Sequence, residues 1–169
     1  MADETWRDDR DQAHFGPDGP AQPAMRWLSS VLTRRDVLEA WGFTDPLLRR
    51  ELVRAWFDAN PHHPALRDQV REELVEVLGQ EEPEHPLWPA FAQTQLVELE
   101  AWLEPVDLLS WGLGSAPRPV SLDEEVVILF ESVPGGDRPP RDEVRRGFKF
   151  LMRHADGRWR VAGFPDESE

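Results

Sequence analysis

The sequence predicts an α+β fold in which N-terminal helices pack on the concave face of a curved, mostly antiparallel C-terminal sheet, a cone. Apolar residues in the first half of the chain recur at helical spacing between helix start and stop signals. The C-terminal part contains two alternating runs, 148–155 and 158–164, which are joined by Asp156-Gly157. That dipeptide favours a tight hairpin turn. Helices followed by a meander of strands are typical of an α+β domain.

The length of 169 residues predicts one domain, which we place at residues 23–165. Residues 1–22 are acidic, rich in Gly and Pro and without an apolar period, so we expect a disordered tail there. Residues 166–169 are expected to fray. Two additional helical runs lie within about 61–104, and we interpret them as a helical insertion in the domain.

Proline, glycine and aspartate mark the expected helix ends. Asp45-Pro46 combines a capping carboxylate with a proline at the first helical position, and Asn60-Pro61 stops the helix that follows. The other expected elements are a helix from Pro23 that breaks at Arg34-Arg35-Asp36, a short helix over 37–42, and helices over 64–78 and from Trp88 to before Pro105.

The strands are expected at 120–133 and in the terminal hairpin, with a short one between 106 and 111. The run 126–130 is almost entirely apolar, which is typical of a strand covered on both faces. A two-residue turn at Asp156-Gly157 predicts the hairpin register. It sets His154 opposite Trp159, Met152 opposite Val161, Phe150 opposite Gly163, Leu151 opposite Ala162, and Arg153 opposite Arg160.

The opposed arginines of this register require a partner. Two guanidinium groups directly across a strand pair repel each other unless a carboxylate lies beside them. Glu131 on the preceding strand is the neighbour that we expect.

Two segments resemble the nuclear transport factor 2-like superfamily, the cystatin-like cone that also includes ketosteroid isomerases and polyketide cyclases of the SnoaL type. The resemblance covers about residues 24–59 and 118–164 and rests on fold pattern, without a catalytic signature. It implies that a curved sheet wraps around helices and leaves a cavity at its wide end. The matching residues are Met25-Arg26-Trp27-Leu28, Arg35-Asp36-Val37-Leu38-Glu39-Ala40-Trp41, Phe150-Leu151-Met152-Arg153-His154 and Asp156-Gly157-Arg158-Trp159-Arg160-Val161-Ala162-Gly163-Phe164.

Composition restricts the function classes. The net charge of −14 argues against general nucleic-acid binding, which requires neutralisation of phosphates. The chain has no cysteine, no apolar run long enough to span a membrane and no N-terminal secretory signal, so we expect a cytoplasmic protein. Residues 138–160 are locally basic, with eight basic and three acidic side chains.

The cavity implied by the resemblance would be lined by one face of the hairpin, opposite helical tryptophans. The alternative interpretation is a fully packed core, which Trp and Met also fill well. The residues expected at the cavity are Trp27, Trp41, Trp102, Phe148, Phe150, Met152, His154 and Trp159.

His154 is the only weak catalytic candidate. On an apolar face its imidazole would act as a general base near neutral pH, whereas at the end of a strand it would be a half-exposed residue without a role. The chain has no tyrosine, which excludes a Tyr oxyanion donor, and Asp36 and Asp45 are better explained as a residue at a helix break and a cap.

No cofactor or metal is predicted. His62, His63 and His85 lack a second ligand at metal-binding spacing, and we interpret them as solvated loop residues. No glycine-rich phosphate loop and no nucleophile elbow is present.

The favoured function is therefore that of a non-catalytic interaction, scaffolding or accessory protein, which self-associates as a homodimer or binds a protein partner. The alternative is a small-molecule binding protein, or an isomerase- or cyclase-like enzyme, that takes a small apolar ligand into the Trp-lined cavity. A third hypothesis is an anion or acidic-partner surface formed by arginines of the C-terminal strands. Those arginines are Arg145, Arg146, Arg153, Arg158 and Arg160.

Overall fold

Helices form the N-terminal part of the molecule and antiparallel strands form the C-terminal part, so the predicted α+β class is confirmed. The structure, a computed structural model, describes residues 13–103, 111–112, 118–131 and 147–165. Within these ranges, no helix combines the length and apolar character that crossing a lipid bilayer requires.

Two carboxylates start helices at the positions that the sequence predicts. Asp36 Oδ1 accepts a hydrogen bond from the Glu39 amide at 3.0 Å, and Asp45 Oδ1 accepts one from the Leu47 amide at 2.9 Å. The helical elements are α2 (Ala21–Ser29), the π-helical turn η1 (Ser30–Arg34), α3 (Val37–Gly42), α4 (Pro46–Ala59), the 3₁₀ turn η2 (Pro64–Leu66), α5 (Arg71–Leu78) and α6 (Trp88–Leu103).

The expected helix over 64–78 is wrong in its middle. The chain forms η2 and α5 as separate elements, and Val70 between them is extended, with φ −85° and ψ 119°. Leu66, Val70 and Leu74 have helical spacing, but the Val70 side chain is 57% exposed while the other two are buried. Burial of Leu66 therefore does not depend on a continuous helix.

The expected boundary of the disordered tail at residue 22 is also wrong. Residues 13–15 are helical and α2 begins at Ala21, two residues before Pro23. His14 is only 2% exposed and its Nδ1 is paired with the Glu125 carboxylate, while Phe15 packs against the core. This long-range pairing orders a segment whose local sequence has no helical period.

The sheet is antiparallel throughout, with strand order β1-β3-β4-β5 and β2 paired to β3. Asp156 and Gly157 have φ of +53° and +75°, the left-handed values that a tight primed turn requires. The predicted pairs from Ala155–Arg158 to Met152–Val161 are confirmed. The strands are β1 (Trp111–Gly112), β2 (Arg118–Pro119), β3 (Glu124–Glu131), β4 (Gly147–Ala155) and β5 (Arg158–Gly163).

Beyond Met152 the predicted hairpin register is wrong. A bulge between Leu151 and Met152 places Leu151 opposite Gly163, so the expected pairs Phe150–Gly163 and Leu151–Ala162 do not form. One extra residue in a strand shifts all later pairs, and nothing in the alternating pattern marks its position.

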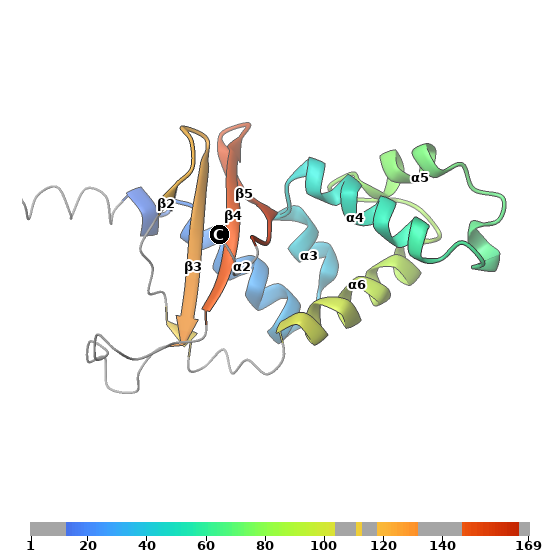
Figure 1. The fold of residues 1–169 in the computed structure, drawn as a ribbon, viewed down its shortest axis with the longest axis horizontal. Helices are drawn as coiled ribbons and strands as arrows, with labels where there is room; N and C mark the ends of the chain where they lie inside the picture. The colour runs from blue at the N-terminus through green and yellow to red at the C-terminus, as the bar shows by residue number, and fades with distance from the viewer. Residues whose placement is uncertain (1–12, 104–110, 113–117, 132–146, 166–169) are drawn as a thin grey trace, which may run out of the picture.

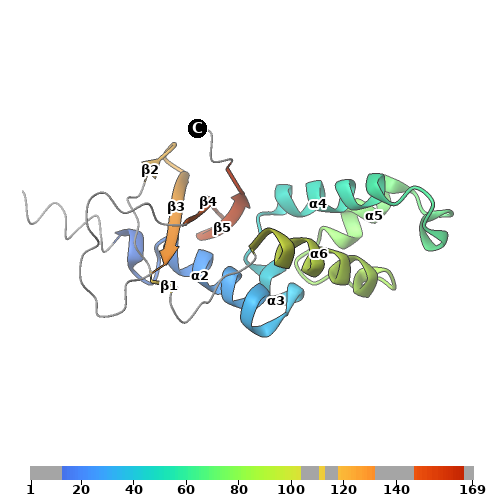
Figure 2. The same cartoon turned by 60° about the horizontal axis from the view of Figure 1, so that its bottom comes forward.

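The molecule is elongated, with the sheet at one end and the pair α4 and α5 at the other (Figure 1). Helix α2 lies against one face of the sheet, and Figure 2 shows α3 between α2 and the pair α4 and α5. Two hydrophobic clusters follow this division. One joins α2 to the sheet, the other joins α3, α4, α5 and the start of α6, and the helices α3, α4 and α6 contribute residues to both.

A short parallel connection ties the start of α4 to β5. Val161 donates its amide hydrogen to the Phe43 carbonyl at 2.8 Å, and its own carbonyl accepts from the Asp45 amide at 2.8 Å. These bonds hold the N-terminus of α4 beside the edge strand, and they place the charged side chains of both elements together.

Candidate functional site

The residues expected around a cavity do not share one. Phe150 and Met152 have no exposed surface and Trp27 packs edge-on against Phe150, with ring centroids 5.6 Å apart. Trp41 belongs to the other hydrophobic cluster, and Trp102 is 43% exposed. Phe148 is buried and contacts the Trp102 ring. The sheet face that would line a cavity therefore packs as core.

His154 is exposed, so the expectation of an imidazole on a buried apolar face is wrong. Its ring lies 5.2 Å from that of Trp159, the predicted cross-strand partner, which is half-buried. Its amide donates to the Asp123 carbonyl at 2.7 Å. The position is the turn end of the hairpin, two residues before Asp156, and the interpretation as a strand-end histidine fits the structure.

The carboxylates that bind Arg153, one of the two opposed arginines, differ from the one expected. Arg153 Nε donates to Glu124 Oε1 at 2.9 Å, and its terminal nitrogen donates to Asp45 Oδ1 at 3.1 Å. Glu131 pairs instead with Trp111 of β1, at the far end of β3. Burial alone lowers the pKa of Arg153, but the hydrogen bonds and charges of Glu124 and Asp45 outweigh it and raise that pKa.

The arginines of the C-terminal strands are engaged within the molecule rather than free for an acidic partner. Arg158 lies 2.6 Å from the Glu81 carboxylate, and Arg160 lies 3.7 Å from the same group. Arg145 and Arg146, the other expected members of this surface, lie outside the described residues.

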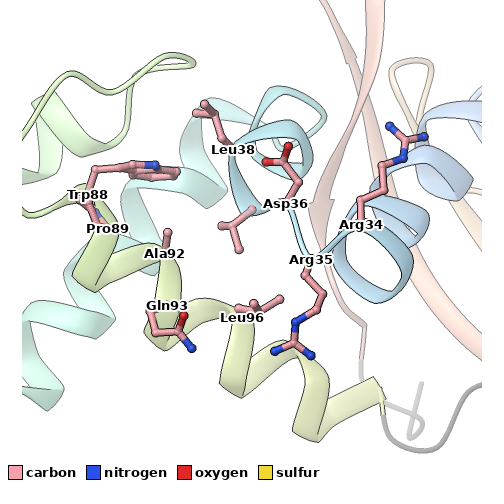
Figure 3. Close-up of a pocket in the computed structure, with 10 residues that line it drawn as sticks. Arg34, Arg35, Asp36, Leu38, Trp88, Pro89, Ala92, Gln93 and Leu96 are labelled. Carbon is pink, nitrogen blue, oxygen red and sulfur yellow. The ribbon is translucent and has the colours of Figure 1, made fainter.

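The structure instead contains a surface groove between α3, the connection 80–87 and the start of α6. Two pockets, of about 370 and 600 Å³, share Asp36, Leu38 and Trp88 and together form it. Figure 3 shows the first pocket, with Trp88, Ala92 and Leu96 of α6 facing the residues around the start of α3. We call this feature the α3–α6 groove.

The chain reversal between η1 and α3 builds one wall of the α3–α6 groove. Arg35 takes the left-handed conformation, with φ 54°, and Asp36 then caps α3. Because α3 begins here, Val37 and Trp41 turn inward while Leu38, 45% exposed, turns toward the groove.

Trp41 and Trp88 fix the opposite wall. The indole nitrogen of Trp41 donates to the carbonyls of Leu78 at 3.1 Å and of Gln80 at 2.9 Å, which holds the connection 80–87 against α3. The Trp88 ring lies 5.5 Å from those of Trp41 and Phe91 and keeps one side in the groove. A tryptophan held between two rings is a rigid apolar floor.

Carboxylates surround this floor. The larger pocket is lined by five acidic side chains and by one basic side chain, Arg158. Glu81 is paired with Arg158, and Glu39 with Arg34. Within the described part of the chain, the other three form no ion pair with another side chain. They are Asp36, Glu82 and Glu84.

The sequence indicates some of these residues but not the groove. The connection from Gln80 to Pro86 is recognisable as acidic and proline-rich, and Asp36 as a helix-break residue. Their proximity depends on the hydrogen bonds of Trp41, which join segments 37 and 39 residues apart. No local pattern encodes that contact.

The described residues contain no group of three or more His, Asp or Glu side chains placed to hold a metal ion. His63 Nδ1 accepts from the Ala65 amide and His85 Nδ1 accepts from the Leu87 amide, so both histidines stabilise turns. Comparison with models of known protein families, with curated proteins and with solved structures yields no match for this chain.

Proposed function

We propose that this chain is a non-catalytic interaction protein that binds a basic segment of a protein partner in the α3–α6 groove. The observation that carries the proposal is the rim of three carboxylates, Asp36, Glu82 and Glu84, which form no ion pair within the described ranges and surround the apolar floor of Leu38 and Trp88. A partner with lysine or arginine beside an apolar side chain complements both features.

Electrostatics supports a basic rather than an acidic or neutral occupant. Clustered like charges at a surface repel one another, and a bound cation relieves that repulsion. The exposed side of the Trp88 ring also offers a cation–π contact, worth about 0.5–1 kcal/mol at such a site. The body of the protein, with a net charge of −14, attracts basic partners at long range.

Fluorescence anisotropy tests the proposal with a short labelled peptide of arginine and leucine residues. We expect binding that weakens as the salt concentration rises from about 50 to 500 mM, because mobile ions screen exposed charges. A peptide with glutamate in place of arginine is the matched probe and should not bind. Equal binding of the two peptides would contradict the proposal.

Variants then assign the binding to the groove. The double variant Glu82→Gln/Glu84→Gln should weaken binding by about 2- to 30-fold, because each surface charge pair contributes about 0.2–1 kcal/mol. The double variant Glu51→Gln/Glu73→Gln removes the same charge from exposed positions on α4 and α5 outside the groove. If this control variant lost as much binding affinity as the groove variant, the loss would reflect net charge alone and would contradict binding in the groove.

A small-molecule ligand is the second candidate. The larger pocket, at about 600 Å³, falls in the size range of ligand sites. The ligand that fits its lining is an aromatic or aliphatic cation rather than the neutral apolar molecule that the cone resemblance implies. Displacement of the labelled peptide by such a cation would favour this candidate over a dedicated protein-binding site.

A further inference from the structure

Two buried arginines interact with Glu81, which lines the larger pocket, and have part of their hydrogen-bonding capacity unused. Arg49 of α4 and Arg160 of β5 are each 4% exposed. Nε and one terminal nitrogen of Arg49, and Nε of Arg160, are buried without a hydrogen-bond partner among the residues that the structure describes. A guanidinium has five N–H donors and cannot release its charge at neutral pH, so such burial is costly.

The surroundings supply too little negative charge for these arginines. Besides Arg49, the cluster contains Arg153, Arg158 and Arg160, and its carboxylates are Asp45, Glu81 and Glu124. Asp45 and Glu124 are both committed to Arg153. Among the described residues, Glu81 alone remains for Arg49, Arg158 and Arg160, which therefore carry two positive charges in excess, and the four arginines and three carboxylates of the cluster have a net charge of +1.

The backbone explains why the excess charge is fixed in place. Arg49 follows Asp45 by one helical turn, and its amide donates to the Asp45 carbonyl at 2.9 Å. The bonds between Val161 and the start of α4 hold this turn beside β5, where Arg160 is the adjacent residue. Burial lowers the pKa of Arg49, with the neighbouring charges of Arg160 and Arg158 acting in the same direction and that of Glu81 against it.

Glu81 is the carboxylate that the chain itself places beside Arg158 and Arg160. It lies on the connection 80–87, its side chain is 38% exposed, and it reaches Arg158 at 2.6 Å but Arg160 only at 3.7 Å. Arg158 is 52% exposed and lines the adjacent pocket, so it stands between solvent and the buried pair.

We propose that Arg49, Arg158 and Arg160 form a binding site for a small oxyanion, a phosphate or a carboxylate, which replaces Glu81 at the cluster. The fork of a guanidinium matches two oxygens of such a group, and the unpartnered N–H donors of Arg49 and Arg160 would be satisfied by it. This site is distinct from the carboxylate rim that binds a basic segment in the proposed function, and it is measured without any peptide.

Calorimetric titration and thermal unfolding test the site with inorganic phosphate, acetate and chloride at equal ionic strength. We expect phosphate or acetate to bind and to raise the melting temperature above the value in chloride, because a ligand of the folded state stabilises it. Preference for phosphate or for acetate identifies which oxyanion the site takes. Identical melting temperatures in all three salts would overturn the proposal and leave water as the partner of the buried donors.

Three variants assign the effect to the cluster. Arg158→Met, at an exposed position that should not impair folding, and Arg49→Met should each weaken oxyanion binding by about 10- to 100-fold, the loss of one charge-assisted hydrogen bond. Glu81→Gln should strengthen binding, because it removes the competing carboxylate. Arg54→Met, on the same helix as Arg49 but paired with Glu72, is the control and should bind like wild type. Undiminished binding by Arg49→Met would refute the site.

Discussion

The Arg153 guanidinium donates to the Asp45 carboxylate at 3.1 Å and joins the terminal hairpin to the start of α4, across 108 residues of sequence. Asp45 is 3% exposed and also caps α4, so one buried carboxylate stabilises both a helix end and a strand pair. This relationship connects the two parts of the α+β fold within the arginine cluster.

Replacement of Asp45 should destabilise the protein strongly. We expect Asp45→Ala to lower the free energy of unfolding by about 3–5 kcal/mol, because it leaves Arg153 without its buried partner and α4 without its cap. Asp45→Asn keeps a good capping group and should lose less. Urea denaturation measures both, with Asp58→Asn, an exposed partner of Arg71, as control. A loss below 1 kcal/mol for Asp45→Ala would contradict the role of the pair.

Arg49→Met should leave the stability unchanged or raise it by about 1–3 kcal/mol in buffer free of oxyanions, because an apolar side chain of similar length replaces an unpartnered buried charge. The lowered pKa of Arg49 means that folding disfavours its charged form, a cost present below the folded pKa and relieved only as pH rises toward the unfolded value. A guanidinium keeps its proton in proteins throughout the neutral range. The stability difference between variant and wild type should therefore be constant between about pH 6 and 9.

Thermal and urea unfolding at several pH values check this expectation. A difference that changes sign or size across that range would mean that another titrating group depends on Arg49. A large destabilisation by Arg49→Met would indicate that its charge is compensated in the free protein.

Trp41→Phe should loosen the connection 80–87. The variant keeps an aromatic ring against Trp88 and Phe91 but loses the indole donor to the Leu78 and Gln80 carbonyls. We expect a loss of about 1–2 kcal/mol and faster amide exchange in residues 80–87. Hydrogen exchange followed by mass spectrometry resolves the segment, and Trp102→Phe, at a 43% exposed position, is the matched control. Unchanged amide exchange in residues 80–87 would show that the Trp41 hydrogen bonds do not hold this wall of the groove.

Phe150→Ala should cost about 3–5 kcal/mol, because the side chain is fully buried and its removal leaves a void between α2 and the sheet. An exposed site such as Leu122→Ala, where the side chain is 98% exposed, should change stability by less than about 0.5 kcal/mol. Chemical denaturation compares the two. A cost for Phe150→Ala as small as that for Leu122→Ala would contradict a packed core and support the hollow cone that the sequence resemblance implies.

Features that depend on neighbouring residues could be predicted before the structure was known. The cap at Asp45 and the turn at Asp156-Gly157 need only a few consecutive residues. The near half of the hairpin register follows from that turn, and it ends at the bulge beside Leu151, where an added residue leaves no sign in the pattern.

Partners distant in the chain could not be predicted in the same way. Glu131 and Glu124 both precede the hairpin on one strand, and only the pairing of β3 with β4 places Glu124 beside Arg153. Similarly, the spacing of Leu66 and Leu74 fits a single helix. In the structure, however, they are buried from two separate elements, η2 and α5, with an exposed Val70 between them.

The amino-acid order alone accounts for the α+β class, the succession of helices and the closing hairpin, because hydrogen bonding and apolar period within each segment encode them. The α3–α6 groove and the arginine cluster arise from folding in three dimensions. Glu81 meets Arg158 across 77 residues, and Trp41 meets Gln80 across 39. Such contacts are selected by packing of the whole chain, which no local pattern records.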